Sequence, residues 1–176
     1  GRLGAIGAPR LSLDIASIKP FLCGTTSYLG TLFALAALAG RGVEAGRLAP
    51  ALKALLETSL AALAELEKSF AGVRFLSAGP NIGSAAYGAA KIVELCRTPA
   101  WSADIEEFAH SQFWAADPGE LIVYIAANPA IAALADHGAA ALKDMGFATI
   151  AIETEGCPVP SASIRLRAPS VEEPLS

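Results

Sequence analysis

Charged side chains are scarce in this sequence. Asp, Glu, Lys and Arg make up 17% of its 176 residues, and the formal net charge is −4. No cluster of Lys and Arg occurs, which argues against nucleic acid and membrane surfaces as partners, because both are bound through basic patches. The apolar content of 53% excludes an intrinsically disordered protein and suits a well-buried globular domain.

Cysteine and histidine are also rare. Cys23, Cys96 and Cys157 lie far apart, and an odd number of cysteines without metal-type spacing is typical of isolated thiols in a reducing compartment. The two histidines, His110 and His137, belong to no HxxxH arrangement, and we interpret His137 as a surface residue. The sequence also lacks a Walker-type loop and a dinucleotide fingerprint. We therefore predict no metal site and no cofactor.

Long hydrophobic runs are missing as well. The most apolar run, residues 29–39, is too short to span a bilayer and is interrupted by Gly30 and Thr31. The N-terminal residues do not have the basic-then-apolar layout of a signal peptide. We therefore expect a cytoplasmic protein that does not bind membranes.

The apolar residues that are present follow alternating helix and strand patterns. We predict helices at residues 26–39, 50–70, 83–96 and 130–145, and strands at residues 73–77, 101–108, 121–126, 148–153 and 162–166. Continuous apolar strands that alternate with helices predict an α/β fold, a three-layer, doubly wound parallel sheet flanked by helices. The first helix is apolar on all sides, so we expect it to be buried.

A glycine-containing turn joins the first of these strands to the helix at 83–96. Helix N-termini favour anions, and ligands of parallel sheets bind outside the carboxyl ends of the strands. The turn is therefore a candidate anion site, although it is weak evidence by itself. Its candidate ligand-binding residues are Ser77, Gly79, Asn81, Gly83 and Ser84.

The helix that follows this turn carries three further candidates on one face. Tyr87, Lys91 and Glu94 are spaced at i, i+4 and i+7. A Lys–Glu pair at this spacing is most often a solvated surface pair. Small residues surround this pair, which makes the two charges more conspicuous, so a surface role and a functional role both remain open.

An acidic segment precedes His110. If residues 101–108 form a strand, Asp104 and Glu106 lie on one face and Glu107 lies on the other. A carboxylate close to the histidine would raise the pKa of the imidazole and fix its tautomer. The alternative interpretation of these acidic residues is a solvated rim at the end of a strand.

Taken together, two segments resemble the sugar isomerase (SIS) family. YGAAKIVE, residues 87–94, is similar to the helix after the turn in that family, and EFAHSQ, residues 107–112, is similar to its histidine motif. The match is best to the second SIS domain of two-domain phosphosugar isomerases and to the isomerase half of glucosamine-6-phosphate synthase. On this resemblance, residues 48–176 form an SIS domain with a flavodoxin-like sheet. Residues 1–47 are a remnant of a preceding SIS domain or an N-terminal extension.

The resemblance implies a sugar phosphate ligand, a homodimer, and either aldose–ketose interconversion or amino-sugar phosphate chemistry. It implies that Glu94 is a base that moves a proton between adjacent sugar carbons. His110 would assist ring opening, and Lys91 would orient the glutamate or a sugar hydroxyl. The residues that would bind substrate are Ser77, Gly79, Asn81, Gly83, Ser84, Tyr87 and Glu107.

Three departures from the family keep other functions open. Tyr87 replaces an acidic residue, and Ser111 and Gln112 replace Gly and Pro. The hydroxyl-rich phosphate loop expected after the strand at 121–126 is replaced by AANPA, residues 126–130, which leaves backbone N–H groups and Asn128. A non-catalytic sugar-phosphate sensor and an assembly domain are therefore alternatives to an enzyme.

Overall fold

A computed structural model describes residues 25–40, 45–64, 66 and 69–168. The chain divides into two compact units, Gly1–Glu44 and Ala45–Ser176. In the first unit, helix α1 (Thr25–Leu38) confirms the helix predicted there. Its Leu35 and Leu38 are exposed. That a partner buries this apolar helix therefore stays a prediction. Within the described ranges, no helix has both the length and the apolar character needed to cross a membrane.

The second unit is built on a parallel sheet of five strands. These are β1 (Gly72–Ser77), β2 (Ala100–Asp104), β3 (Glu120–Ala126), β4 (Ala148–Glu153) and β5 (Ile164–Arg167), in the spatial order β2-β1-β3-β4-β5. Every neighbouring pair is parallel. This is the flavodoxin-like order, and it confirms the predicted doubly wound sheet.

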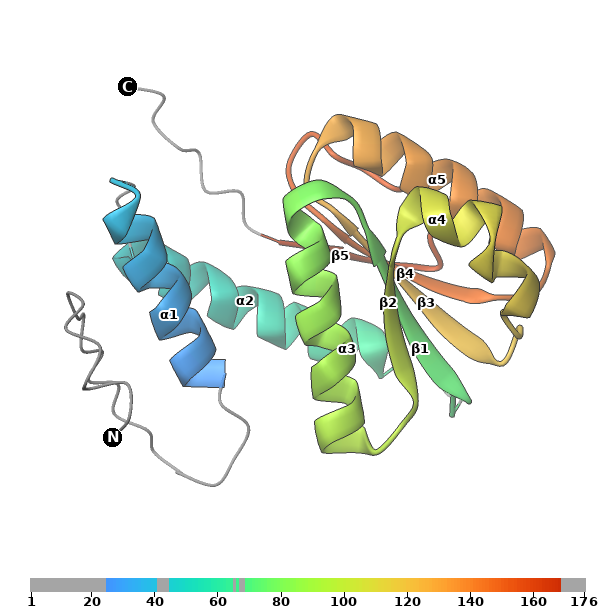
Figure 1. Ribbon diagram of the computed structural model, residues 1–176, viewed down its shortest axis with the longest axis horizontal. Helices are drawn as coiled ribbons and strands as arrows, with labels where there is room; N and C mark the ends of the chain where they lie inside the picture. Colours follow the sequence, from blue (N-terminus) through green and yellow to red (C-terminus); the bar gives the residue numbers. More distant parts are fainter. Residues whose placement is uncertain (1–24, 41–44, 65, 67–68, 169–176) are drawn as a thin grey trace, which may run out of the picture. The chain divides into compact units, whose positions relative to one another are not determined.

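Helices cover both faces of this sheet (Figure 1). Helices α2 (Ala45–Leu63) and α3 (Ile82–Cys96) lie on one face, and α4 (Ile105–His110) and α5 (Pro129–Asp144) lie on the other. Two short 3₁₀ turns, η2 (Gly79–Asn81) and η3 (Gln112–Ala115), follow β1 and α4. The result is the three-layer arrangement that the sequence predicted.

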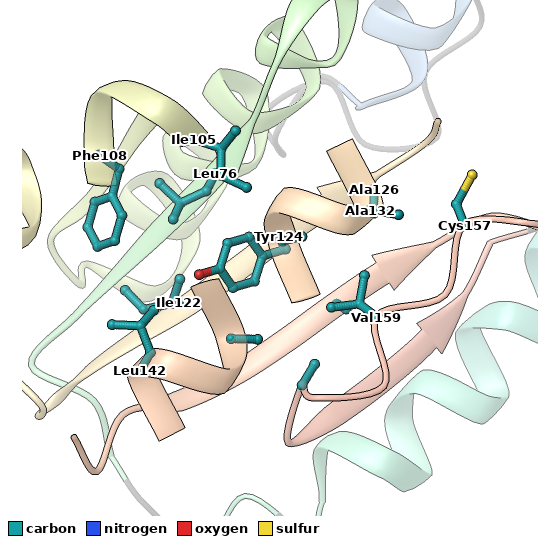
Figure 2. Close-up of a cluster of buried hydrophobic side chains, with 14 of the residues drawn as sticks. Leu76, Ile105, Phe108, Ile122, Tyr124, Ala126, Ala132, Leu142, Cys157 and Val159 are labelled. Carbon is teal, nitrogen blue, oxygen red and sulfur yellow. The ribbon is translucent and has the colours of Figure 1, made fainter. Parts of the chain in front are cut away.

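Alternating side chains of the strands form two cores, one on each face. Leu76, Ile122 and Tyr124 point to the α4 and α5 side, where they are fully or almost fully buried (Figure 2). Leu121 and Val123 are buried on the α2 and α3 side. Strand β3 is therefore buried on both faces, as its continuous apolar sequence predicted.

Helix α3 packs closely on the sheet because of its small residues. A Cβ atom at Gly88 would lie 2.9 Å from the ring of Phe75 on β1, and Ala85 and Ala89 are buried. A larger residue at position 88 would push the helix away from the strand. The small residues around Lys91 and Glu94 thus serve the contact between helix and sheet.

Two element predictions were wrong. The strand predicted at residues 101–108 ends at Asp104, and residues 105–108 belong to α4. The reason is that the Asp104 carboxylate accepts hydrogen bonds from the backbone N–H groups of Glu106 and Glu107, which starts a helix. The predicted alternation of Asp104, Glu106 and Glu107 along a strand therefore does not occur.

The second error concerns α2, which runs from Ala45 to Leu63 and not over residues 50–70. Pro50 lies inside the helix and not in its first turn, so one backbone hydrogen bond of the helix is missing there. Leu66 and Phe70 follow the helix and still pack against the sheet, because their apolar side chains belong to the same core. Apolar spacing predicted the buried face of this segment but not the residue at which the helix ends.

Candidate functional site

A crevice is expected where β1 and β3 end side by side. The helix after β1, α3, lies on one face of the sheet, and the helix after β3, α5, lies on the other (Figure 1). In open parallel sheets, ligands bind at such a topological switch point, outside the carboxyl ends of the strands. The η2 turn lies at this edge, directly before α3.

Four of the predicted binding residues lie together at this edge. Gly79, in the turn, has a φ of +58°, a left-handed conformation that favours glycine. Asn81 and Gly83 follow it, and Ser84 is exposed in the first turn of α3. A Cβ atom at Gly83 would have no atom within 4 Å, so this position faces open space.

Ser77, the fifth predicted residue of the turn, is fully buried at the end of β1. Its hydroxyl donates a 2.8 Å hydrogen bond to the backbone carbonyl of Ile125 on β3. The side chain therefore ties the two strands together across the switch point. It is engaged inside the protein and does not face a ligand.

The helix N-termini at this edge differ in how they are capped. Asp104 caps α4, and the Asn128 Oδ1 atom caps α5 by accepting a 2.9 Å hydrogen bond from the N–H of Ile131. The side chain of Asn81 makes no cap hydrogen bond to α3. The N–H of Ile82, the first residue of α3, instead donates to the backbone carbonyls of Gly79 and Pro80 in η2, so the turn and the helix together form the N-terminal end that can favour an anion. Asn128, by contrast, is already used as a cap.

Tyr87, Lys91 and Glu94 form a row on α3, as their spacing predicted. The Lys91 Nζ atom lies 2.5 Å from Glu94 Oε2 and 5.2 Å from the centre of the Tyr87 ring. The Glu94 side chain is 49% exposed, and that of Lys91 is 21% exposed. Glu94 comes twelve residues after Ile82, which corresponds to about 18 Å along a helix. The ion pair is therefore distant from the N-terminus of α3.

Glu107 and His110 lie in α4, on the other face of the sheet. The Glu107 Oε1 atom accepts a 2.5 Å hydrogen bond from the Ser111 hydroxyl. His110 is the last residue of α4 and is exposed. It borders a cavity of about 380 Å³ between α4 and α5, which His137 also borders. His137 is exposed, in agreement with the prediction of a surface position.

The predicted site residues therefore occupy three places. One group lies at the turn before α3, a second lies further along α3, and the third lies in α4 beyond the sheet. The structure of one chain does not bring Glu94 and His110 together. In the part of the chain that the structure describes, no three His, Cys, Asp or Glu side chains form a group that could hold a metal ion.

Sequence reasoning missed one buried acid at the same edge of the sheet. Glu153, at the end of β4, is 2% exposed and accepts hydrogen bonds from Val159 N–H at 3.0 Å, from Arg165 at 2.9 and 3.0 Å, and from Arg167 at 3.3 Å. Burial alone would raise the pKa of Glu153, but these hydrogen bonds and the charge of Arg165 lower it overall. Glu153 is thus ionised and fully engaged in holding β5 and the loop before it. Only knowledge of the β4–β5 register could have revealed this cluster.

Sheet order, layers and the switch point are those of a flavodoxin-like α/β domain, and the likeness to solved structures shows that the fold is the SIS fold that the resemblance implied. Several solved structures share it. They include glucosamine-6-phosphate deaminase from Thermotoga maritima (TM-score 0.67, 16% identity, covering 88% of this chain and 49% of that one). Tagatose-6-phosphate ketose/aldose isomerase from Escherichia coli is also similar (TM-score 0.62, 17% identity, covering 85% of this chain and 43% of that one). The C-terminal domain of glucosamine-fructose-6-phosphate aminotransferase from Francisella tularensis is similar too (TM-score 0.57, 18% identity, covering 84% of this chain and 39% of that one).

These likenesses establish the fold, because the identities are all below 20%. The present chain spans less than half of the length of each of these three chains. No family model matches the sequence, and no curated protein matches it by sequence.

Proposed function

We propose that this chain is a phosphosugar-binding, isomerase-like domain of a protein with two SIS domains, of which residues 48–176 form one. Three solved structures with the same fold carry the names of proteins that act on sugar phosphates. The proposal includes a homodimer in the cytoplasm. A reducing compartment suits the unpaired thiols of Cys96, which is exposed, and Cys157, which is buried.

The observation that carries the proposal is the N-terminus of α3 at the switch point. Its cap residue Asn81 makes no side-chain hydrogen bond to the helix, although the N–H of Ile82 donates to the carbonyls of Gly79 and Pro80, and the positive end of the helix dipole favours a phosphate there. Gly83 leaves open space beside it, and the exposed hydroxyl of Ser84 is a further donor. Neutral donors of this kind can bind a phosphate in a protein whose net charge is negative.

The proposed chemistry is aldose–ketose interconversion or a reaction of an amino-sugar phosphate. Such a reaction moves a proton between adjacent carbons, and a positioned carboxylate can act as the base. Glu94 is proposed as this base, Lys91 holds its carboxylate, and His110 assists ring opening. Since the sheet lies between α3 and α4, this active site would need a second copy of the chain or a second domain. Proton transfer of this kind needs no redox cofactor.

The alternative is a sensor that binds a sugar phosphate without converting it, or a domain that serves assembly only. Two observations favour it. Glu94 is paired with Lys91 at the surface, about 18 Å along α3 from the proposed phosphate position. The loop after β3 has no Ser or Thr, and its Asn128 is used to cap α5.

A charge introduced at Gly83 tests the binding site directly. An Asp at this position has room and suits the first turn of a helix, so the variant should fold, but its carboxylate would repel a phosphate. Gly83→Asn is the matched neutral control. We expect millimolar fructose-6-phosphate or glucosamine-6-phosphate to raise the melting temperature of the wild type and of Gly83→Asn, but not of Gly83→Asp.

The same samples separate the enzyme from the sensor. If dimeric wild-type protein binds a sugar phosphate but does not interconvert fructose-6-phosphate and glucose-6-phosphate, the result would favour the sensor over the enzyme. Absence of any melting-temperature shift in the wild type with either ligand would overturn the proposed function. An equal shift in Gly83→Asp and Gly83→Asn would place the phosphate elsewhere.

A further inference from the structure

The cavity between α4 and α5 is separate from the proposed phosphate position. It measures about 380 Å³ and lies on the face of the sheet opposite α3. Its walls are mostly apolar and include Phe108, Phe113, Leu134, Leu142 and Met145. Such a lining, with few polar groups, is typical of sites for small organic molecules.

Tyr124 is one of the polar residues that line this cavity, with Glu106, His110 and His137. Tyr124 lines the cavity although the residue is only 1% exposed. Figure 2 shows its oxygen directed into the space between Phe108, Ile122 and Leu142. Among the residues that the structure describes, none forms a hydrogen bond with this hydroxyl. No buried side-chain nitrogen or oxygen of the described residues lacks a hydrogen-bond partner, so this hydroxyl is accessible from the cavity and can donate a hydrogen bond to a ligand oxygen there.

Gly138 makes room for this hydroxyl. A Cβ atom at position 138 would lie 2.7 Å from the Tyr124 oxygen, closer than real Cβ contacts. Glycine inside a helix costs stability relative to alanine. The helix α5 therefore carries an unfavourable residue at a point where the tyrosine oxygen lies close to it. This pairing indicates that the position of the hydroxyl matters.

The surroundings of Tyr124 select against charged ligands. Burial raises the pKa of the Tyr124 hydroxyl well above its usual value, so the group is protonated at neutral pH and donates a hydrogen bond. The same loss of solvation would penalise a phosphate or carboxylate at this depth. The residues that line the cavity include His110, His137 and Glu106 but no Lys or Arg.

We propose that this cavity is a second ligand site, which takes a small, uncharged and largely apolar molecule with one hydrogen-bond-accepting oxygen. Phenols meet these requirements, since they combine an apolar ring with one oxygen. The oxygen of such a ligand accepts a hydrogen bond from Tyr124, and its ring lies among apolar walls that include the edge-to-face pair of Phe108 and Phe113. The cavity borders His110, which the proposed function assigns to ring opening, but it lies on the face of the sheet opposite the proposed phosphate position.

The test compares p-cresol with toluene, which has a similar shape but no oxygen. Backbone amide NMR shifts are followed while each compound is titrated into wild-type protein and Tyr124→Phe. We expect p-cresol to shift amides of α4 and α5 in a saturable way. Loss of the tyrosine hydroxyl should weaken p-cresol binding by about 3- to 10-fold and leave toluene binding unchanged.

Two matched substitutions of alanine by leucine locate the site. Ala141 lines the cavity on α5, and its neighbour Ala140 is exposed but does not line it. Ala141→Leu should abolish p-cresol binding, while Ala140→Leu should bind like the wild type. The proposal is overturned if p-cresol gives no saturable shift in α4 and α5, or if Ala141→Leu does not alter binding.

A second copy of the chain could occupy the cavity in place of a ligand. Sedimentation of the same variants distinguishes the two. If Ala141→Leu dissociates a wild-type dimer while Ala140→Leu does not, a partner chain fills the cavity, and the ligand proposal is wrong. If the variants sediment like the wild type and differ only in p-cresol binding, the ligand site is supported.

Discussion

Glu94 and His110 lie on opposite sides of the parallel sheet, one in α3 and the other in α4. The sheet between these helices separates the proposed base from the proposed ring-opening residue within one chain. The two can serve one sugar only if different chains or domains supply them. A symmetric dimer would then contain two equivalent sites, each with one residue from each copy.

This arrangement predicts complementation between two inactive variants. Glu94→Gln and His110→Ala should each lack isomerase activity as homodimers. When the two chains are refolded together, random pairing gives mixed dimers with one intact site, and we expect about a quarter of wild-type activity. Activity retained by either single variant would remove that residue from the chemistry. Two inactive variants that show no recovery on mixing would contradict the shared site.

The ion pair of Lys91 and Glu94 should contribute little to folding. The glutamate is half exposed, and pairs at this spacing on a helix surface are worth about 0.3–0.5 kcal/mol. We therefore expect Glu94→Gln to lower the free energy of unfolding, measured in urea, by less than about 0.5 kcal/mol. A small loss of stability would make this variant a clean test of chemistry. A loss of several kcal/mol would mean that the pair has a structural role.

The cap formed by Asp104 should determine whether α4 forms. Replacing a capping Asp with Ala costs about 0.5–2 kcal/mol of stability, while Asn keeps most of the cap. We expect Asp104→Ala to fall in this range and Asp104→Asn to lose much less. The N–H groups of Glu106 and Glu107 donate hydrogen bonds to this carboxylate. Their hydrogen exchange with solvent should therefore become faster in Asp104→Ala but not in Asp104→Asn. Equal exchange in both variants would show that packing of Ile105 and Phe108 alone holds the helix.

The same residue explains one limit of the sequence analysis. Strands β1, β3 and β4 were predictable because each is a short, mostly apolar run that the sheet buries. Residues 105–108 could be read as either strand or helix, and the hydrogen bonds that the Asp104 side chain accepts from backbone N–H groups decide between them. Such a bond is local, so an Asp before two acidic residues was a usable signal for a helix start.

The candidate site was predictable only in part, for a different reason. The turn from Gly79 to Asn81 was found because a strand, a turn and a helix follow one another in the chain. The engagement of Ser77 with Ile125, and of Glu153 with Arg165, depends on which strands are neighbours. Strand order is set by long-range packing, which a single sequence does not display.

Glu153 should make the protein sensitive to acid. Its pKa is lowered in the folded state from an ordinary value of 4.5, so its stabilising effect is complete above that value and is lost as the pH falls through the lower folded pKa. Glu153→Gln should lose about 1.5–3 kcal/mol at neutral pH, as expected for hydrogen bonds to a buried charge. The variant should also lose less stability than the wild type when the pH drops below about 4.5.

Arg167 provides the control for this prediction. Its side chain is 81% exposed, and its contact with Glu153 is 3.3 Å long. Arg167→Ala should change the free energy of unfolding by less than about 0.5 kcal/mol and keep the acid sensitivity of the wild type. Urea unfolding of both variants at neutral and acidic pH measures these effects. Parallel pH profiles for Glu153→Gln and the wild type would show that Glu153 does not cause the acid sensitivity.

The close approach of Gly138 to Tyr124 predicts a pair of substitutions that compensate each other. In Gly138→Ala the new methyl group would lie 2.7 Å from the tyrosine oxygen, and forcing an extra group into a packed site costs about 1–3 kcal/mol. Tyr124→Phe removes that oxygen and leaves the ring in place. The double variant should therefore be more stable than Gly138→Ala alone, helped by the better helix propensity of alanine. Urea unfolding of the wild type, both single variants and the double variant gives the coupling energy directly. Additive effects of the two substitutions would mean that α5 moves to admit the methyl group, and the hydroxyl of Tyr124 would then not be held at a fixed position in the cavity.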